Sequence, residues 1–144
     1  MRTVSEIIDN KGSMVLCVNQ NESVRDAISL MADVNIGAVL VKQNDNIAGI
    51  FTERDYLQRV VLQSRSSEDT TVKEVMTSPV ISARPGDTVQ GCLQTMTNCR
   101  CRHLPIVENN ELLGIISIGD LVKSLVDEKE TEIAQLNQYI AGSY

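Results

Sequence analysis

The chain has 144 residues, a length that fits one ordinary domain, and a formal net charge of −6 at pH 7. Aromatic residues make up 3% of it and tryptophan is absent, so the basic surface and stacking platforms of nucleic-acid binders are both missing. No apolar run approaches about 18 residues, and residues 1–9 contain acids without a long apolar stretch, which predicts a cytoplasmic protein with no nucleic-acid or membrane partner.

The first half of the chain predicts the order strand, helix, strand, strand, helix. Apolar runs between turn signals place these elements at about 14–18, 23–34, 37–42, 46–51 and 53–63. A polar stretch at 63–71 then predicts a connection between two halves.

The second half predicts the same order after a turn at 76–79. Its elements are expected at about 80–83, 88–98, 103–107, 111–116 and 118–129. The paired strands of each half are apolar on both faces, so they need cover on both sides. We therefore expect an α/β (α+β) fold of two repeats, each β-α-β-β-α, packed sheet to sheet about a pseudo-twofold axis.

The two halves are an internal duplication. Residues 49–55 (GIFTERD) and 114–120 (GIISIGD) share a pattern 65 positions apart, and residues 23–31 match 88–96 at that same offset. Between them the offset is read as 66, with 36–41 facing 102–107. The predicted division is a first repeat with its N-terminal lead-in at 1–66, a linker at 67–71, a second repeat at 72–129 and a C-terminal helical extension at 130–144.

Each repeated motif places a hydroxyl and a carboxylate three residues apart where a strand runs into a helix. Such a pair is also how many helices cap their own N-termini. The same corner offers free N–H groups and the positive end of a helix dipole to a phosphate, and the carboxylate can accept hydrogen bonds from a ribose diol. Recurrence in register on two diverged sequences favours the binding interpretation.

These motifs resemble the ligand signature of cystathionine-β-synthase (CBS) domains. The resemblance also rests on residues 36–38 (IGA) and 103–107 (HLPIV), and the tandem is similar to a CBS pair, or Bateman module, over essentially the whole chain. Residues 52–57, 117–120 and 139–142, with the early Lys11-Gly12, are similar to stand-alone CBS-pair proteins of bacteria and plant mitochondria.

The resemblance implies a regulatory ligand, AMP, ATP or NAD(H), bound in clefts between the repeats, with no catalytic cofactor, and a homodimer shaped as a flat disc. Asp55 and Asp120 would hold ribose hydroxyls, and Thr52 and Ser117 would approach phosphate. Backbone groups near Val15 and Ile81 would read the adenine edge. The residues that would border the base and phosphates are Ile36, Gly37, Ala38, Arg102, His103 and Leu104.

The two sites are not expected to be equal. Arg100, Arg102 and His103 precede the second copy's strand where the first copy is neutral, whereas Glu53 and Arg54 lie opposite Ile118 and Gly119 in the motifs. Our hypothesis is that the site centred on Ser117 and Asp120 is the stronger, the alternative for Arg102 and His103 being a solvated strand edge. Lys11 either contributes a charge to phosphate or is a surface lysine.

The four cysteines show no framework-like spacing, so free thiols are the expectation for Cys17, Cys92, Cys99 and Cys101. Cys99-Arg100-Cys101 leaves metal binding or redox cycling open in principle. There is no second cysteine pair, however, and His103 is the only histidine, which disfavours a metal site.

The sequence therefore predicts a non-catalytic regulatory module that senses an adenine nucleotide or NAD(H) and signals to an unknown partner protein. The alternative is a dimeric interaction scaffold with vestigial nucleotide sites. An enzyme is disfavoured because paired carboxylates and metal-ligand spacing are missing. At the C-terminus Ile133, Leu136 and Ile140 fall on one helix face, which packs either on the protein's own body or, as we favour, on a second copy.

Overall fold

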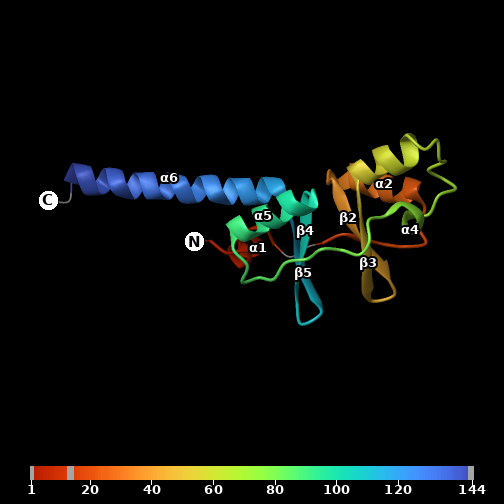
Figure 1. Cartoon of the computed structure of the whole chain (residues 1–144), viewed down its shortest axis with the longest axis horizontal. Coiled ribbons are helices and arrows are strands. Elements are labelled where there is room, and N and C mark those ends of the chain that lie inside the picture. Colours follow the sequence, from red (N-terminus) through yellow and green to blue (C-terminus); the bar gives the residue numbers. More distant parts are fainter. Residues whose placement is uncertain (1, 13–14, 143–144) are drawn as a thin grey trace. The chain divides into compact units, whose positions relative to one another are not determined.

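The computed structural model describes residues 2–12 and 15–142 and divides the chain into two compact units. Unit 1 comprises residues 1–13 and 82–144, and unit 2 comprises residues 14–81. Figure 1 shows the elements of each unit in the colours of the sequence. Both units combine helices with a small sheet, so the predicted mixed α/β (α+β) class is confirmed.

Unit 2 contains a sheet in the order β1-β2-β3 with helix α2 packed on it. Strand β1 (Cys17–Asn19) runs parallel to β2 (Ala38–Gln43), which is antiparallel to β3 (Asn46–Thr52). Helix α2 (Val24–Val34) begins at Ser23, whose hydroxyl accepts a hydrogen bond from the Asp26 N–H group. Its buried face joins β2 and β3 in one apolar core around Phe51.

The helix predicted at 53–63 has two parts. The α-helical turn α3 (Glu53–Asp55) passes into a π-helix (Tyr56–Val61) that buries Val60. A further short helix, α4 (Val72–Val75), follows the polar connection and begins with a capping box between Thr71 and Glu74.

Unit 1 is built on the hairpin of β4 (His103–Glu108) and β5 (Glu111–Ser117), with α1 (Val4–Lys11) and α5 (Val89–Cys99) beside it. The prediction of a strand at 80–83 is wrong. Only Ala83 pairs, through one isolated parallel bridge to Ile106. In unit 2 the N–H groups of Leu40 and Gln20 extend the β1-β2 ladder, and their counterparts here are Pro105 and Pro85. Neither proline has an N–H group to donate, so the ladder does not extend beyond Ala83.

The predicted slip of the repeat to an offset of 66 is also wrong. Ala38 pairs with Thr52 and His103 pairs with Ser117, so strand β4 lies 65 positions after β2 at both ends. Each hairpin carries its register shift at the same place, after Val41 and after Ile106. By this register Gly37 corresponds to Arg102 and Ala38 corresponds to His103.

Each helix that precedes a repeat in the sequence belongs to the unit of the other repeat; we call these helices, α1 and α4, the lead-in helices. Helix α1 completes unit 1, where the Val4 N–H group donates to the Asp87 carbonyl at 2.9 Å. Helix α4 completes unit 2 in the same way, with Val72 N–H donating to the Glu22 carbonyl at 2.9 Å. Each unit is thus closed by the segment that precedes the other repeat in the sequence.

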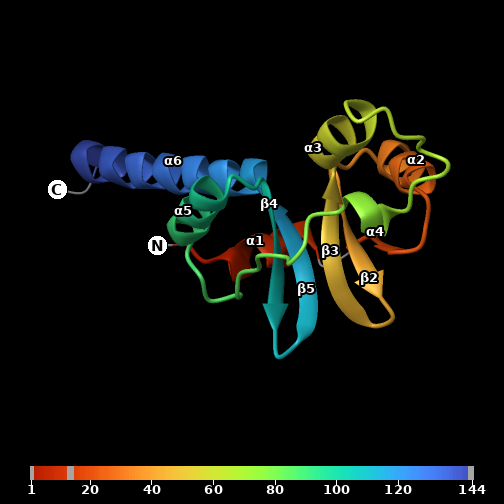
Figure 2. The same cartoon turned by 45° about the vertical axis from the view of Figure 1, so that its right-hand side comes forward.

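Helix α6 (Ile118–Gly142) spans 25 residues, about 37 Å at the usual rise. Its first turns pack in unit 1, where Leu121 is fully buried, and every residue from Lys129 to Ala141 is exposed. Figures 1 and 2 both show it as one continuous helix, as the sequence predicts for the run beyond residue 129. Within the described residues, no helix is both long and apolar enough to cross a membrane.

Candidate functional site

Two strand-to-helix corners carry the residues singled out by the sequence. The first corner is Thr52–Asp55 in unit 2, and the second corner is Ser117–Asp120 in unit 1. In both, the carboxylate accepts a hydrogen bond from the N–H group that precedes the helix, and the hydroxyl accepts one from the aspartate N–H group. Both aspartates therefore act as the third residue of a capping box, a role usually taken by Glu or Gln.

At the first corner the Asp55 carboxylate is saturated by protein groups. Its Oδ2 atom accepts hydrogen bonds from the Thr52 N–H group at 3.0 Å and the Thr52 hydroxyl at 3.1 Å. Its Oδ1 atom accepts one from the Thr77 hydroxyl at 2.9 Å, with Arg59 Nη1 at 3.9 Å. Only 9% of the Asp55 side chain is exposed, so this carboxylate has little capacity left for a ligand.

The space in front of the first corner is also occupied. The Glu53 carboxyl group lies over Gly37, and a Cβ atom added to Gly37 would stand 3.5 Å from Glu53 Cδ. The Glu53 N–H group donates to the Gly37 carbonyl at 3.0 Å, which holds the two residues together. A negative charge at this position repels phosphate.

At the second corner a lysine takes part in the aspartate's hydrogen bonding. Lys11 Nζ lies 2.6 Å from Asp120 Oδ2 and 3.0 Å from the Ile115 carbonyl oxygen. The same Oδ2 atom accepts from the Ser117 N–H group at 2.9 Å, whereas no described residue hydrogen-bonds to Oδ1. The Asp120 side chain is 26% exposed, so this carboxylate retains a free oxygen that solution can reach.

Helix length explains why a lysine takes this place. In unit 2 helix α4 ends at Val75, and Thr77 then pairs with Ile50 through both of its backbone groups. In unit 1 helix α1 continues to Lys11, so its backbone does not pair with Ile115, the counterpart of Ile50. The Lys11 side chain reaches that carbonyl instead.

The pKa of the Asp120 carboxyl is set by opposing effects. Burial alone would raise it, but the hydrogen bond and charge of Lys11, with the hydrogen bonds from Ser117, lower the pKa of this carboxyl below its usual range. Asp120 is therefore ionised at neutral pH and ready to accept hydrogen bonds.

A cavity of about 550 Å³ lies beside Asp120 within unit 1, between α1 and the first turns of α6. This volume is within the range of small-molecule sites. Its walls combine basic and acidic side chains with the buried hydroxyl of Ser124, which has no hydrogen-bond partner among the described residues. The lining residues are Arg2, Glu6, Ile7, Asp9, Asn10, Lys11, Asp120, Lys123, Ser124 and Asp127.

The remaining predicted site residues divide between the units. Arg102 adjoins the second corner, where its carbonyl accepts from the Ile118 N–H group at 2.9 Å, and His103 and Leu104 begin the adjoining strand β4. Ile36, Gly37 and Ala38 adjoin the first corner, and Arg54 is exposed there. Val15 precedes β1, and Ile81 is exposed and outside any strand.

Two residues at the first corner, Thr77 and Arg59, were not predicted, and neither was helix α1, which brings the predicted Lys11 to Asp120 at the second corner. A signal for the two lead-in helices exists in the sequence, because residues 3–6 (TVSE) and 71–74 (TVKE) repeat the pattern of a capping box before an apolar helix. No short pattern identifies Thr77, because its contact with Asp55 spans 22 residues along the chain. Arg59 follows Asp55 by four residues, a spacing at which an acid and a base lie side by side on a helix.

Comparisons with known proteins agree with this architecture. The CBS domain family model matches twice, at residues 4–62 and 72–127. The mitochondrial CBS domain-containing protein CBSX3 of Arabidopsis thaliana is 38% identical over 99% of this chain and 73% of its own length. A solved protein with CBS domains from Burkholderia ambifaria is 47% identical, with a TM-score of 0.85 over 88% of this chain and 95% of that one.

The chain therefore belongs to the CBS domain family, as a tandem CBS pair. CBS pairs are regulatory modules, and the CBS pair of protein MJ0100 was solved in complex with 5′-methylthioadenosine and S-adenosyl-L-methionine. That structure shares the fold at a TM-score of 0.78 and 20% identity, covering 89% of this chain and 98% of that one. The predicted cytoplasmic location stays a prediction, since the plant relative is mitochondrial.

Proposed function

We propose that this chain is a regulatory module that binds one adenosine-containing nucleotide, AMP, ATP or NAD(H), at the second corner. The observation that carries the proposal is the contrast between the aspartates: Asp55 is buried and saturated, whereas Asp120 keeps an oxygen open beside a cavity. The adenosine class is supported by membership of the family and by the adenosine compounds bound in the MJ0100 structure.

Binding would use groups already at the corner. The ribose diol donates hydrogen bonds to the Asp120 carboxylate and displaces Lys11 from Oδ2. The Lys11–Asp120 ion pair is exposed, and such pairs contribute little net stability, so its loss is a small cost. The released Lys11 ammonium then neutralises a ligand phosphate, with Arg102 on the neighbouring loop as a second cation. The N-terminal end of α6 adds a favourable dipole.

The same ion pair provides a route for signalling. Lys11 ends α1 and Asp120 begins α6, so their contact joins these two helices in the ligand-free protein. A nucleotide that takes Asp120 breaks this contact and favours a different placement of α1 against α6. Since a ligand shifts only states that it binds unequally, this difference is what a regulated protein would sense.

Isothermal titration with AMP, ATP and NADH tests the proposal. We expect one nucleotide per chain and at least about tenfold weaker binding in Asp120→Ala, because charged hydrogen bonds contribute about 1.5–3 kcal/mol each. Glu130→Ala is the matched control, since Glu130 is an exposed acid on the same helix outside the cavity lining, and the affinity of this variant should equal that of wild type. Two equal sites, or unchanged affinity in Asp120→Ala, would contradict the proposal, and no binding by wild type would favour the scaffold alternative.

We also propose that the distal part of α6 mediates homodimerisation. Six residues of α6 follow one another at alternating spacings of four and three, which is the heptad pattern of a coiled coil. Five of them are apolar, namely Val122, Val126, Ile133, Leu136 and Ile140, and the sixth is Lys129. Val122 and Val126 are each 48% exposed, and Ile133 and Leu136 are 58% and 59% exposed. Apolar side chains with this period are best covered by an equivalent helix, and a second copy supplies one.

Sedimentation velocity tests this association. Wild type should sediment as a dimer. Leu136→Asp places a charge in the heptad seam and should sediment as a monomer, whereas Ala134→Asp, on the outer face of the same helix, should remain a dimer. A Leu136→Asp protein that remains dimeric would show that any dimer forms elsewhere.

A further inference from the structure

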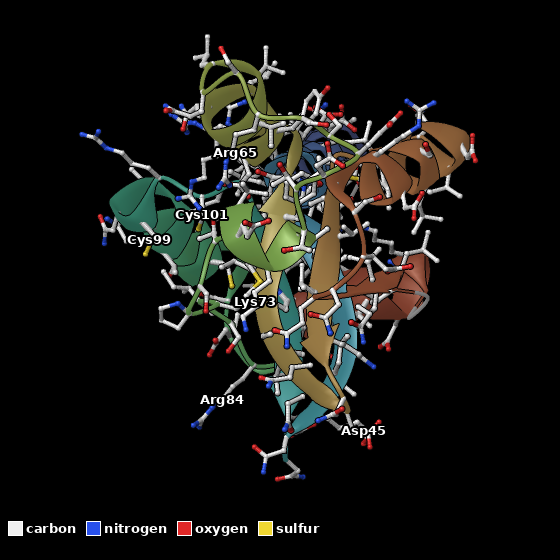
Figure 3. The ribbon with its side chains drawn as sticks, turned by 90° about the vertical axis from the view of Figure 1, so that its right-hand side faces the viewer. Asp45, Arg65, Lys73, Arg84, Cys99 and Cys101 are labelled. Carbon is white, nitrogen blue, oxygen red and sulfur yellow. The ribbon has the colours of Figure 1, made fainter. Side chains whose placement is uncertain are left out.

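Cys99 and Cys101 flank the C-cap of helix α5. Cys99 is the last residue of the helix, and Arg100 follows in the left-handed conformation, with φ 55° and ψ 36°. The Cys101 N–H group then donates to the Met96 carbonyl at 3.1 Å, which fixes the start of the outgoing chain. Figure 3 shows both cysteines at this helix end.

This turn brings the two cysteines to a separation that a disulfide can bridge. A left-handed residue holds the Cα atoms of its two neighbours about 5.5 Å apart, and disulfides usually join Cα atoms about 4.4–6.8 Å apart. The pKa of the Cys101 thiol is raised chiefly by burial and further by the charge and hydrogen bond of Cys99. The two side chains are therefore close enough to interact. Both are free thiols here.

The helix cap itself does not require cysteine. At the equivalent position of unit 2, Asn35 takes the same left-handed conformation, with φ 57° and ψ 51°, between Val34 and Ile36. Both caps return two N–H groups to the last helical turn. Two thiols on either side of one such residue are therefore a feature of unit 1 alone, added to a turn that forms without them.

We propose that Cys99 and Cys101 are a reversible dithiol–disulfide pair that reacts with low-molecular-weight disulfides of the glutathione class. The exposed Cys99 thiolate attacks one sulfur of oxidised glutathione, forming a mixed disulfide and releasing one glutathione thiolate. The Cys101 thiolate then attacks Cys99 Sγ, closing the intramolecular disulfide and releasing the second glutathione. The protein loses two protons and two electrons, and the oxidised glutathione is reduced to two thiols.

Exposure sets the order of the two attacks. Cys99 is exposed, whereas Cys101 is partly buried against the apolar core of unit 1, so Cys99 meets the reagent first. Burial raises the pKa of the Cys101 thiol, which further disfavours it as the first nucleophile. Its nearness to Cys99 then makes the second step intramolecular and fast.

The pair is connected directly to the second corner. The residue after Cys101 is Arg102, whose carbonyl holds the Ile118 N–H group at 2.9 Å where α6 begins. Closing a ring from residue 99 to residue 101 restrains this loop and, through it, the start of α6. If nucleotide binding occurs at this corner as proposed above, its affinity should differ between the reduced and oxidised forms.

The test is oxidation of the full chain with oxidised glutathione, followed by intact-mass and peptide-mass measurements. Wild type should lose two hydrogen atoms, with a disulfide in the peptide containing Cys99 and Cys101, and dithiothreitol should restore the dithiol. Cys101→Ser should instead accumulate glutathione on Cys99, at least about tenfold more than wild type at equal times. Cys17→Ser, in unit 2, should behave as wild type.

Wild type that accumulates the Cys99 adduct as strongly as Cys101→Ser, or a disulfide that joins other cysteines, would overturn the pairing. These readouts do not involve a nucleotide, so their failure is distinct from failure of the proposed function. Titration of AMP into the reduced and oxidised wild type then tests the connection to the second corner, and equal affinities would refute it.

Discussion

The first corner and the second corner descend from one motif, yet their aspartates have different surroundings. Asp55 accepts hydrogen bonds on both oxygens from Thr52 and Thr77, and 9% of its side chain is exposed. Asp120 shares one oxygen between Ser117 and Lys11 and is 26% exposed. The motif thus defines the cap at a helix start, whereas the lead-in helix decides whether the carboxylate stays open to a ligand.

The largest expected difference between the corners is in stability. Asp55→Ala should lower the free energy of unfolding by about 3 kcal/mol, because the Thr52 N–H group and the Thr77 hydroxyl lose a partly buried acceptor. Asp120→Ala should lower the free energy of unfolding by only about 1 kcal/mol, which is the usual contribution of a helix cap. Urea denaturation of both variants measures this, and equal losses would show that the corners are energetically alike.

The glycines before the two corners provide a second comparison. A Cβ atom at Gly49 would lie 2.7 Å from the backbone oxygen of Thr77, whereas one at Gly114 would meet only the end of the Ile8 side chain, at 2.5 Å. Gly49→Ala should therefore lower the free energy of unfolding by about 2 kcal/mol and Gly114→Ala by under about 1 kcal/mol. Thermal denaturation of the pair checks the order, which a larger loss in Gly114→Ala would reverse.

Lys11→Met should change the affinity of the second corner for a phosphate without lowering its affinity for a ribose. Without the ammonium, Asp120 is free for a ribose but a phosphate loses its cation, so AMP should bind about tenfold more weakly, or about 1.4 kcal/mol, while adenosine should bind no more weakly. Titration calorimetry with both compounds measures the difference. Equal weakening of AMP and adenosine would mean that Lys11 does not contact the phosphate.

The smallest expected effect is a dependence of stability on pH. The pKa of Asp120 is lowered in the folded protein, so its stabilising contribution is complete above the unfolded pKa of about 3.9 and is lost as pH falls through the lower folded value. The stability difference between wild type and Lys11→Met should be under about 1 kcal/mol at pH 6 and should shrink as pH falls below the unfolded pKa of about 3.9. Urea denaturation across this range tests it, and a difference that grows in acid would contradict the assignment.

Much of the fold was predictable because it depends on local signals. Hairpins with apolar strands around Asn44 and Asn109, and helices beginning at Ser23 and Thr88, follow from turn residues, caps and periodicity. The strand expected at 80–83 does not form because Pro105 and Pro85 lack the N–H groups that would extend its pairing beyond Ala83. The offset of 66 failed because sequence similarity alone does not fix strand register, which the pairing of His103 with Ser117 does.

The site was predictable only in part. The motif identifies Ser117 and Asp120, and the charge comparison favours their corner over the first one. That Thr77 closes over Asp55, or that Lys11 reaches Asp120 across 109 positions, depends on tertiary packing of the lead-in helices. The capping-box patterns of these helices, at 3–6 and 71–74, are visible in the sequence. The sequence does not show which repeat's core each helix packs on.

The exchange of lead-in helices affects how the chain tolerates truncation. Removing the first eleven residues would leave the N-terminal sequence repeat largely intact and would damage the C-terminal one, since Val4 is fully buried beside Met96 and Leu104 in its core. A fragment that begins at residue 72 would likewise lack helix α1, which contributes to the core of unit 1, and would contain helix α4, which belongs to unit 2. Residues 14–81 hold the complete core of unit 2 in one continuous segment, whereas the core of unit 1 needs residues 1–13 as well as 82–144.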